Sequence, residues 1–187
     1  MFSEIIYNAI KKTTLLHEGQ TRKDLEKTPY ISHLVGVALI LSQYTSDEDI
    51  IIAGLLHDTI EDTSYTPEDL ERDFGKKIKD IVMGVTEDKN IKNWKERKQN
   101  YLDNLKTAPE ESLLVATADK IHNMTSLSID FRGLDEGVLK KFSSNVQERI
   151  WFHEEVLKIL ENSTQNKIIE EYKKVFNKSK EKFITSS

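Results

Sequence analysis

Residues 47–62 read DEDIIIAGLLHDTIED, and this stretch decides the fold. Its first three residues are acidic, which is favourable at the positive end of a helix, and Ser46 before them is expected to cap that end. Residues 50–56 are almost wholly apolar, as is typical of a helix buried on all sides. We therefore expect residues 47–62 to form the central helix of the core.

Apolar residues recur at helical spacing through the rest of the chain. Thr66 and Pro67, followed by two acids, are a strong helix start, and Gly75 is expected to separate that helix from the next. Pro29 argues against a helix through residues 19–29, and the charged residues 87–98 are expected to form a loop that leads into a helix. The expected helices span residues 2–16, 30–44, 66–74, 76–86, 110–127, 135–160 and 166–183.

No stretch alternates as a strand would, so the expected fold class is all-α, a single-domain helical bundle. The 187 residues fit one domain, with the functional residues at about 20–130 and C-terminal helices at about 135–183.

Composition narrows the classes of function. The absence of cysteine excludes disulfides, thiolate zinc sites and a cysteine nucleophile. The N-terminus does not resemble a signal peptide and no apolar run is long enough to span a membrane, so a soluble, cytoplasmic protein without a membrane partner is expected. A net charge of −5 argues against general nucleic-acid binding, but it allows a small anionic substrate that a metal or local charge attracts.

The central stretch ends in His57-Asp58-x-x-Glu61-Asp62. Four ionisable side chains at the inner end of a buried helix are costly unless something compensates them, and a divalent cation is the simplest compensation. On a helix, His57 and Glu61 share a face, as do Asp58 and Asp62, so one turn can present two metal ligands beside two carboxylates. The alternative is a neighbouring His-Asp pair and a solvated helix end.

A lone acid, Asp119, lies within the apolar stretch LLVATADKIHNM, and Asn123 follows on the same face. A buried carboxylate needs a partner, which is usually a metal or a basic side chain. The alternative is a buried ion pair with Lys120, but adjacent residues on a helix do not face each other.

His33 stands at the start of the helix expected after Pro29, where a satisfied core histidine is the alternative to a ligand. His17, His122 and His153 are expected to be ordinary structural histidines, with His122 pointing away from Asp119 around the helix.

The order His33, then His57-Asp58, then Asp119 resembles the H…HD…D signature of the HD-domain phosphohydrolases. More narrowly, the chain resembles the hydrolase domain of RelA/SpoT-type enzymes and the free-standing small alarmone hydrolases. The matching stretches cover about the first two thirds of the chain, and they are TRKDLEKTPYISH, AGLLHDTIEDT, Phe74-Gly75, VTEDK and ATADKIHNM.

The resemblance implies an HD-type helical bundle that removes the 3′-pyrophosphate from (p)ppGpp, with Mn²⁺ as the usual metal. The implied metal ligands are His33, His57, Asp58 and Asp119. Glu61 and Asp62 match the pair that positions or activates the attacking water. Arg22 and Lys23 match a basic pair at the nucleotide site, and Asn123 matches a residue that contacts the substrate. For Arg22 and Lys23, the alternative is an ordinary solvated loop.

Two imidazoles and two carboxylates without a thiolate suit Mn²⁺ or Fe²⁺ in an octahedral arrangement. Two positions depart from the family pattern. Leu34 stands where proline is usual, which the structure should tolerate. Thr125 stands where many members have arginine, which removes a positive charge near the site and leaves the exact substrate open. Five basic residues, Lys89, Lys92, Lys95, Arg97 and Lys98, are expected to lie on a solvated helix face, and the alternative is that they flank the substrate.

Two other functions stay open beside alarmone hydrolysis. One is an HD phosphohydrolase for another nucleotide or phosphate ester, and the other is a helical module that binds a nucleotide without cleaving it. A nucleic-acid-binding helical domain is the weakest candidate.

Overall fold

The structure is a computed structural model, and it describes residues 3–130 and 146–185. The all-α prediction is confirmed, since the described residues contain helices and only one isolated β-bridge, between Thr21 and Pro29. The helices are α1 Glu4–Leu16, α2 Ile31–Leu41, α3 Glu48–Leu56, α4 Thr59–Asp62, α5 Pro67–Phe74, α6 Lys76–Met83, α7 Trp94–Leu105, α8 Glu110–Asp130, α10 Val146–Ser163 and α11 Ile168–Thr185.

The start signals read from the sequence are largely confirmed. Thr66 and Asp69 form a capping box with Pro67 in the first turn of α5, and Gly75 adopts a φ of 87° between α5 and α6. The expected cap at Ser46 is wrong by one residue, because the Asp47 carboxylate accepts the hydrogen bond from the Asp49 amide.

Residues 87–98 were expected to form a loop that leads into a helix, and the helix, α7, begins within this segment at Trp94. The Asn93 side chain accepts a hydrogen bond from the Glu96 amide and so caps the helix there. Of the helix expected at residues 135–160, positions 135–145 lie outside the described residues.

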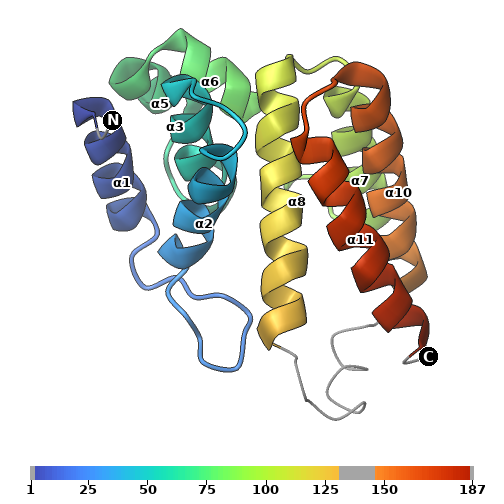
Figure 1. Cartoon of the computed structure of the whole chain (residues 1–187). Helices are drawn as coiled ribbons and strands as arrows, with labels where there is room; N and C mark the ends of the chain where they lie inside the picture. Colours follow the sequence, from blue (N-terminus) through green and yellow to red (C-terminus); the bar gives the residue numbers. More distant parts are fainter. Residues whose placement is uncertain (1–2, 131–145, 186–187) are drawn as a thin grey trace.

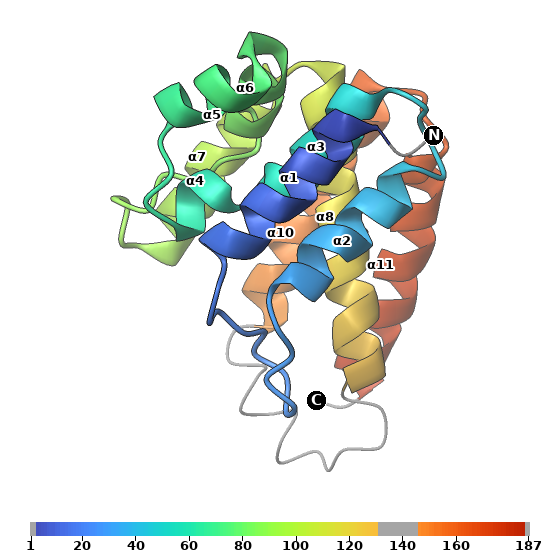
Figure 2. The ribbon, with the colours of Figure 1, turned by 90° about the vertical axis from the view of Figure 1, so that its left-hand side faces the viewer.

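The long helix α8 is the centre of the molecule. It packs against α2, α3 and α6 on one side and against α11 on the other, while α10 joins α7 to α11 (Figure 1). Figure 2 shows α1 lying across α3, with α8 behind them. Many residues of α8 are apolar and buried, among them Leu113, Val115, Ala116 and Ala118.

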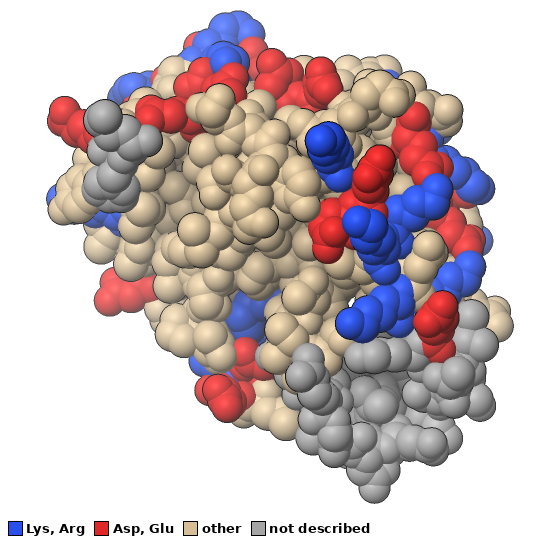
Figure 3. All heavy atoms as spheres, viewed as in Figure 1, with Lys and Arg blue, Asp and Glu red and all other residues tan. Residues whose placement is uncertain are grey.

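The surface in the view of Figure 1 carries charges of both signs. Lys and Arg alternate with Asp and Glu over α10 and α11, and the part over α2 and α8 is largely uncharged (Figure 3). Among the described residues, no helix combines the length and apolar character needed to cross a bilayer.

Candidate active site

The central stretch is not one continuous helix, contrary to the expectation. It breaks between α3 and α4, and His57 and Asp58 lie at the break. Side chains satisfy the backbone carbonyls that α3 leaves free, because His57 Nδ1 lies 2.8 Å from Gly54 O and Thr59 Oγ1 donates to Leu56 O at 2.6 Å. The break therefore turns both His57 and Asp58 toward α8.

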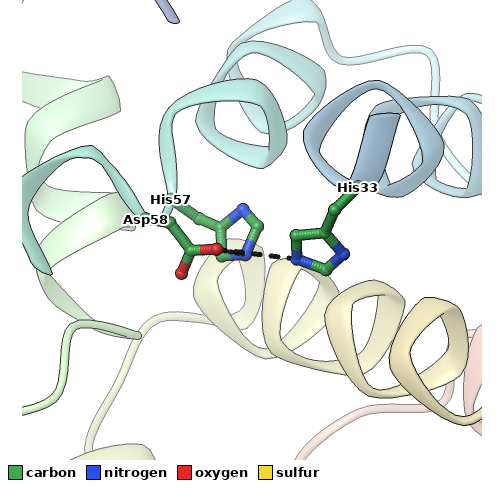
Figure 4. Close-up of side chains that lie close together, drawn as sticks. All are labelled: His33, His57 and Asp58. Carbon is green, nitrogen blue, oxygen red and sulfur yellow. Dashed lines mark ion pairs between the residues drawn. The ribbon is translucent and has the colours of Figure 1, made fainter. Parts of the chain in front are cut away.

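Four side chains from three parts of the chain converge at this break, and we call them the ligand cluster: His33 from α2, His57 and Asp58 from the α3–α4 junction, and Asp119 from α8. Nε2 of His33 lies 3.5 Å from Asp58 Oδ2 and 3.3 Å from Asp119 Oδ1. Nε2 of His57 lies 3.2 Å and 3.9 Å from the same two oxygens. Figure 4 shows the two rings and the Asp58 carboxylate pointing toward one another above α8.

The ligand cluster fits a divalent cation. Donor atoms about 2.1 Å from an octahedral ion lie about 3.0 Å apart when adjacent and about 4.2 Å apart when opposite. The four separations between an imidazole nitrogen and a carboxylate oxygen fall in this range, and the ligand atoms of His33, His57 and Asp58 all lie within 4.8 Å of one another. Nε2 of His57 is moreover buried and has no hydrogen-bond partner among the described residues, so it can bind an ion once its proton has left.

His122 supports the ligand cluster, so the expectation that it points away from Asp119 is wrong. Residues three apart on a helix lie on neighbouring faces, and Nδ1 of His122 lies 2.9 Å from Nδ1 of His33. This contact orients the His33 ring with its Nε2 toward the carboxylates, as a histidine partner commonly does for a metal ligand. Gly36 leaves room for His122, because a Cβ there would lie 2.3 Å from the imidazole.

The two carboxylates of the ligand cluster are held by further side chains. Tyr30 donates its hydroxyl to Asp58 Oδ2 at 2.7 Å, and Asn123 donates to Asp119 Oδ1. Lys120 Nζ lies 2.6 Å from Asp119 Oδ2, so the argument that adjacency prevents this pair is wrong. The four-carbon stem of lysine is long enough to fold back along the helix to its neighbour.

The other two histidines do not join the ligand cluster. Nδ1 of His17 lies 2.8 Å from Gln20 Oε1, and the ring stacks on Tyr30 at a centroid distance of 5.3 Å. Nδ1 of His153 lies 2.8 Å from the Tyr172 hydroxyl.

The charges of the ligand cluster stabilise one another. Burial acts to lower the pKa of His57, but Asp58 and Asp119 outweigh it and raise the pKa to about 9. Burial acts to raise the pKa of Asp58, yet His57 and His33 hold that pKa well below its usual range. A cation that binds here would displace the proton of His57, so its binding releases protons.

Glu61 and Asp62 follow on α4, but they differ in position. Glu61 lines the cavity at the ligand cluster, and its carboxylate accepts a hydrogen bond from the Glu87 amide. Burial raises the pKa of Glu61 to about 7, to which the charge of Asp58 contributes. Asp62 lies at the rim, where its carboxylate pairs with Lys89 and its backbone carbonyl accepts a bond from Gln20 at 2.8 Å.

The two basic residues of the loop before α2, Arg22 and Lys23, differ in position. Arg22 donates to Asn123 Oδ1 at 2.8 Å and to Ser126 Oγ at 3.2 Å, which places its guanidinium one turn of α8 beyond Asp119. Lys23 is exposed and contacts none of the residues of the ligand cluster. The structure thus brings Arg22 and Asn123 to the site together.

A cavity of about 190 Å³ extends from the ligand cluster toward α7. Sequence reasoning missed its far wall, where Lys98 and Lys120 lie beside Tyr101. The expectation of a solvated face is wrong for Lys98, whose ammonium pairs with Glu87 and is largely buried. Burial and the neighbouring Lys120 lower the pKa of Lys98. A sequence signal for the burial of Lys98 was available. Trp94, Lys98 and Leu102 are four residues apart and so lie on one face of the helix, and Leu102 is a core residue.

An all-helical fold that converges two imidazoles and two carboxylates beside a buried glutamate defines a class, the helical proteins with a His/Asp site for a divalent cation. Residues 9–132 match the family described as HD domain, which is more than half of the chain. The chain belongs to the HD domain family.

Similar proteins agree with this assignment. The guanosine-3′,5′-bis(diphosphate) 3′-pyrophosphohydrolase MESH1 of Xenopus tropicalis is 40% identical over 156 residues, which are 82% of this chain and 82% of that protein. The bifunctional (p)ppGpp synthase/hydrolase SpoT of Escherichia coli K12 is 38% identical over 117 residues, 59% of this chain but 16% of that protein. A solved structure of a metazoan orthologue of SpoT that hydrolyses ppGpp superposes with a TM-score of 0.81 at 27% identity, covering 95% of this chain and 97% of that one.

Proposed function

We propose that the protein hydrolyses guanosine 3′,5′-bis(diphosphate) and its triphosphate counterpart at the 3′-pyrophosphate, which gives GDP or GTP and pyrophosphate. The observation that carries the proposal is that Nε2 of His33 and Nε2 of His57 each lie within 3.9 Å of carboxylate oxygens of Asp58 and Asp119, beside Glu61 in the same cavity. The relatives that share the fold and much of the sequence bear this activity in their names. The expected cytoplasmic location belongs to the same proposal.

The ligand cluster would hold the cation, and Mn²⁺ is our choice because a set of two imidazoles and two carboxylates suits it, with Fe²⁺ as the alternative. When bound, such a cation supplies positive charge to the phosphate and acidifies a water molecule. The four residues keep the site polar and anionic, while Tyr30 and Asn123 fix the two carboxylates in place.

Glu61 is the residue that we assign to proton transfer from the attacking water. Its carboxylate lines the cavity, the Glu87 amide fixes its orientation, and a pKa raised to about 7 suits a general base near neutral pH. Asp62 has a supporting role, because its carboxylate holds Lys89 at the rim.

Arg22 and Asn123 are assigned to the substrate, with Lys23 as an outer contact that the nucleotide would meet at the exposed loop. The guanidinium of Arg22 lies over the Tyr30 ring at 5.8 Å and can pair with a phosphate through two donors. Threonine at position 125 is compatible with ppGpp as the substrate. Its side chain is exposed, and Arg22 supplies positive charge at Asn123 and Ser126.

The experiment is turnover of ppGpp by the purified, Mn²⁺-loaded protein, with GDP and pyrophosphate separated by anion-exchange chromatography. Asp119→Ala should abolish turnover, whereas Asp103→Ala, an exposed carboxylate on α7, should retain it. A folded, metal-loaded protein that leaves ppGpp intact but cleaves another nucleotide would instead establish the broader HD phosphohydrolase function. Binding of ppGpp without turnover of any nucleotide would establish a non-catalytic module.

A further inference from the structure

Two lysine ammonium groups share the cavity wall opposite His57, and we call Lys98 and Lys120 the lysine pair. Their side chains are only 17% and 11% exposed. Lys98 belongs to α7 and Lys120 to α8, so the packing of these two segments, not a local sequence motif, brings the two side chains together. Two like charges in a small, largely enclosed space are costly unless anions compensate them.

Aromatic rings fix the position of the lysine pair. Phe152 of α10 lies 4.7 Å from Lys98 Nζ and 5.8 Å from Lys120 Nζ, measured to the ring centroid. Tyr101 lies 5.0 Å from Lys120 Nζ and Trp94 5.9 Å from Lys98 Nζ. The rings attract the ammonium groups without using their N–H donors.

Each ammonium group has N–H donors that the described residues do not use. An ammonium carries three N–H donors, and in the described part of the chain Lys98 uses one on Glu87 and Lys120 uses one on Asp119. Both carboxylates are also shared, because Glu87 pairs with Arg97 at 3.1 Å and Asp119 belongs to the ligand cluster. The lysine pair therefore keeps unused N–H donors that face the cavity, and such donors can bind an anion.

The position of the lysine pair indicates which part of a nucleotide it would meet. Arg22 contacts Asn123 and Ser126, one to two turns of α8 beyond Lys120, and it does not line the cavity. The cavity of about 190 Å³ is smaller than the roughly 300 Å³ at which pockets for drug-sized ligands begin, so a whole nucleotide does not fit inside it. The part of the wall at the lysine pair is polar and cationic, which suits a phosphate group rather than a base.

We propose that Lys98 and Lys120 form a phosphate subsite that binds the distal phosphate of the 3′-pyrophosphate and then the departing pyrophosphate. This inference rests on the proposed function. In the reaction, the oxygen of water bonds to the phosphorus that is joined to the ribose 3′-oxygen. That P–O bond breaks, the 3′-oxygen takes a proton, and the distal phosphate leaves as part of pyrophosphate. Phe152 lies beyond residues 9–132, so the inference also gives α10 a part in the site.

The test is the binding of inorganic pyrophosphate, added as its metal complex, to the metal-loaded protein by calorimetry. Lys98→Gln should weaken binding about 10- to 100-fold, as expected for the loss of a hydrogen bond to a charged group, while Lys98→Arg should stay close to the wild type. Lys95→Gln is the matched control, because Lys95 is exposed one turn earlier on α7. The pyrophosphate inhibition constant and the KM for ppGpp should rise in parallel with the loss of binding.

Two results would overturn the subsite. One is wild-type pyrophosphate binding by folded Lys98→Gln protein, and the other is an equal loss in Lys95→Gln. If the protein does not turn over ppGpp but Lys98→Gln still loses pyrophosphate binding, the proposed function fails and the subsite stands. If Lys98→Gln does not fold, Lys98→Arg decides, since a ten-fold loss of binding in that variant with an intact metal content contradicts the proposal.

Discussion

Two adjacent residues of α8 serve opposite walls of one cavity. Asp119 faces His33 and His57 on the side of α2 and α3, and Lys120 folds back toward the rings of α7 and α10. One wall gathers carboxylates and imidazole lone pairs that suit a cation, and the other gathers ammonium groups that suit an anion. The cavity is thus divided between two kinds of charge.

The two walls would serve different tasks, metal binding on one side and pyrophosphate binding on the other, and substitutions can distinguish them. A change on the wall of the ligand cluster should act on the rate and on metal affinity, whereas a change in the lysine pair should act on the binding of pyrophosphate. Asp119 belongs to both walls, so the effects of such substitutions also show whether the two walls act independently or are coupled through this residue.

The largest effect is expected for Glu61→Gln. Loss of a general base typically lowers the rate by about 10²- to 10⁴-fold, so kcat should fall within that range while metal content and pyrophosphate binding stay unchanged. Steady-state kinetics with ppGpp measures this, and Glu96→Gln, an exposed glutamate of α7, is the control. A fall of less than tenfold would remove Glu61 from proton transfer.

The sequence predicted the wall of the ligand cluster because its residues lie in short motifs on apolar helices. His57 and Asp58 are neighbours, and Asp119 is a lone acid in an apolar run. Their expected burial was enough to predict that a cation or another charge compensates them. The prediction of His33 as a metal ligand depended on the family resemblance, because a lone histidine on an apolar helix is as compatible with a structural role.

The lysine wall could not be predicted because its identity depends on contacts between α7, α8 and α10. Lys98 stands in a run of charged residues, and its helical spacing from Leu102 predicts a shared face but not the packing of Phe152 against its ammonium group. The break at His57 escaped prediction for a related reason. The hydrogen bonds from His57 and Thr59 to the last carbonyls of α3 have no distinct sequence signal in a helix-like apolar pattern.

The next largest effect concerns stability and pH in the metal-free protein. The pKa of Glu61 rises from 4.5 to about 7 on folding, so the unfolded chain releases this proton first. Stability is therefore lost as pH rises from 4.5 to 7, by about 3 kcal/mol at full ionisation of Glu61.

Denaturant unfolding in the presence of a chelator, at pH 5 and pH 8, measures this loss. Glu61→Gln cannot ionise, so it should gain stability relative to the wild type between these two values, and Glu96→Gln should not. Equal pH dependence of Glu61→Gln and the wild type would show that Glu61 titrates normally, and the cavity would then be less dry than its burial indicates.

A smaller effect is expected for His122→Ala. This substitution removes the partner of His33 Nδ1 and leaves all four members of the ligand cluster in place. Loss of such a supporting contact typically weakens metal binding about 10- to 100-fold. Metal titration measures it, with Thr125→Ala on the same helix as the control. Unchanged metal affinity would mean that packing alone orients His33.

The smallest effect is a coupling between Gly36 and His122. A Cβ at position 36 would lie 2.3 Å from the His122 imidazole, so Gly36→Ala must displace that ring or the backbone of α2. We expect Gly36→Ala to cost about 1–2 kcal/mol of stability in the wild type, as overpacking does, and much less in His122→Ala, where the ring is absent. Denaturant unfolding of the two single variants and the double variant gives the coupling energy. Additive losses would show that α2 absorbs the methyl group without moving His122, and the contact that orients His33 would then be looser than its 2.9 Å separation implies.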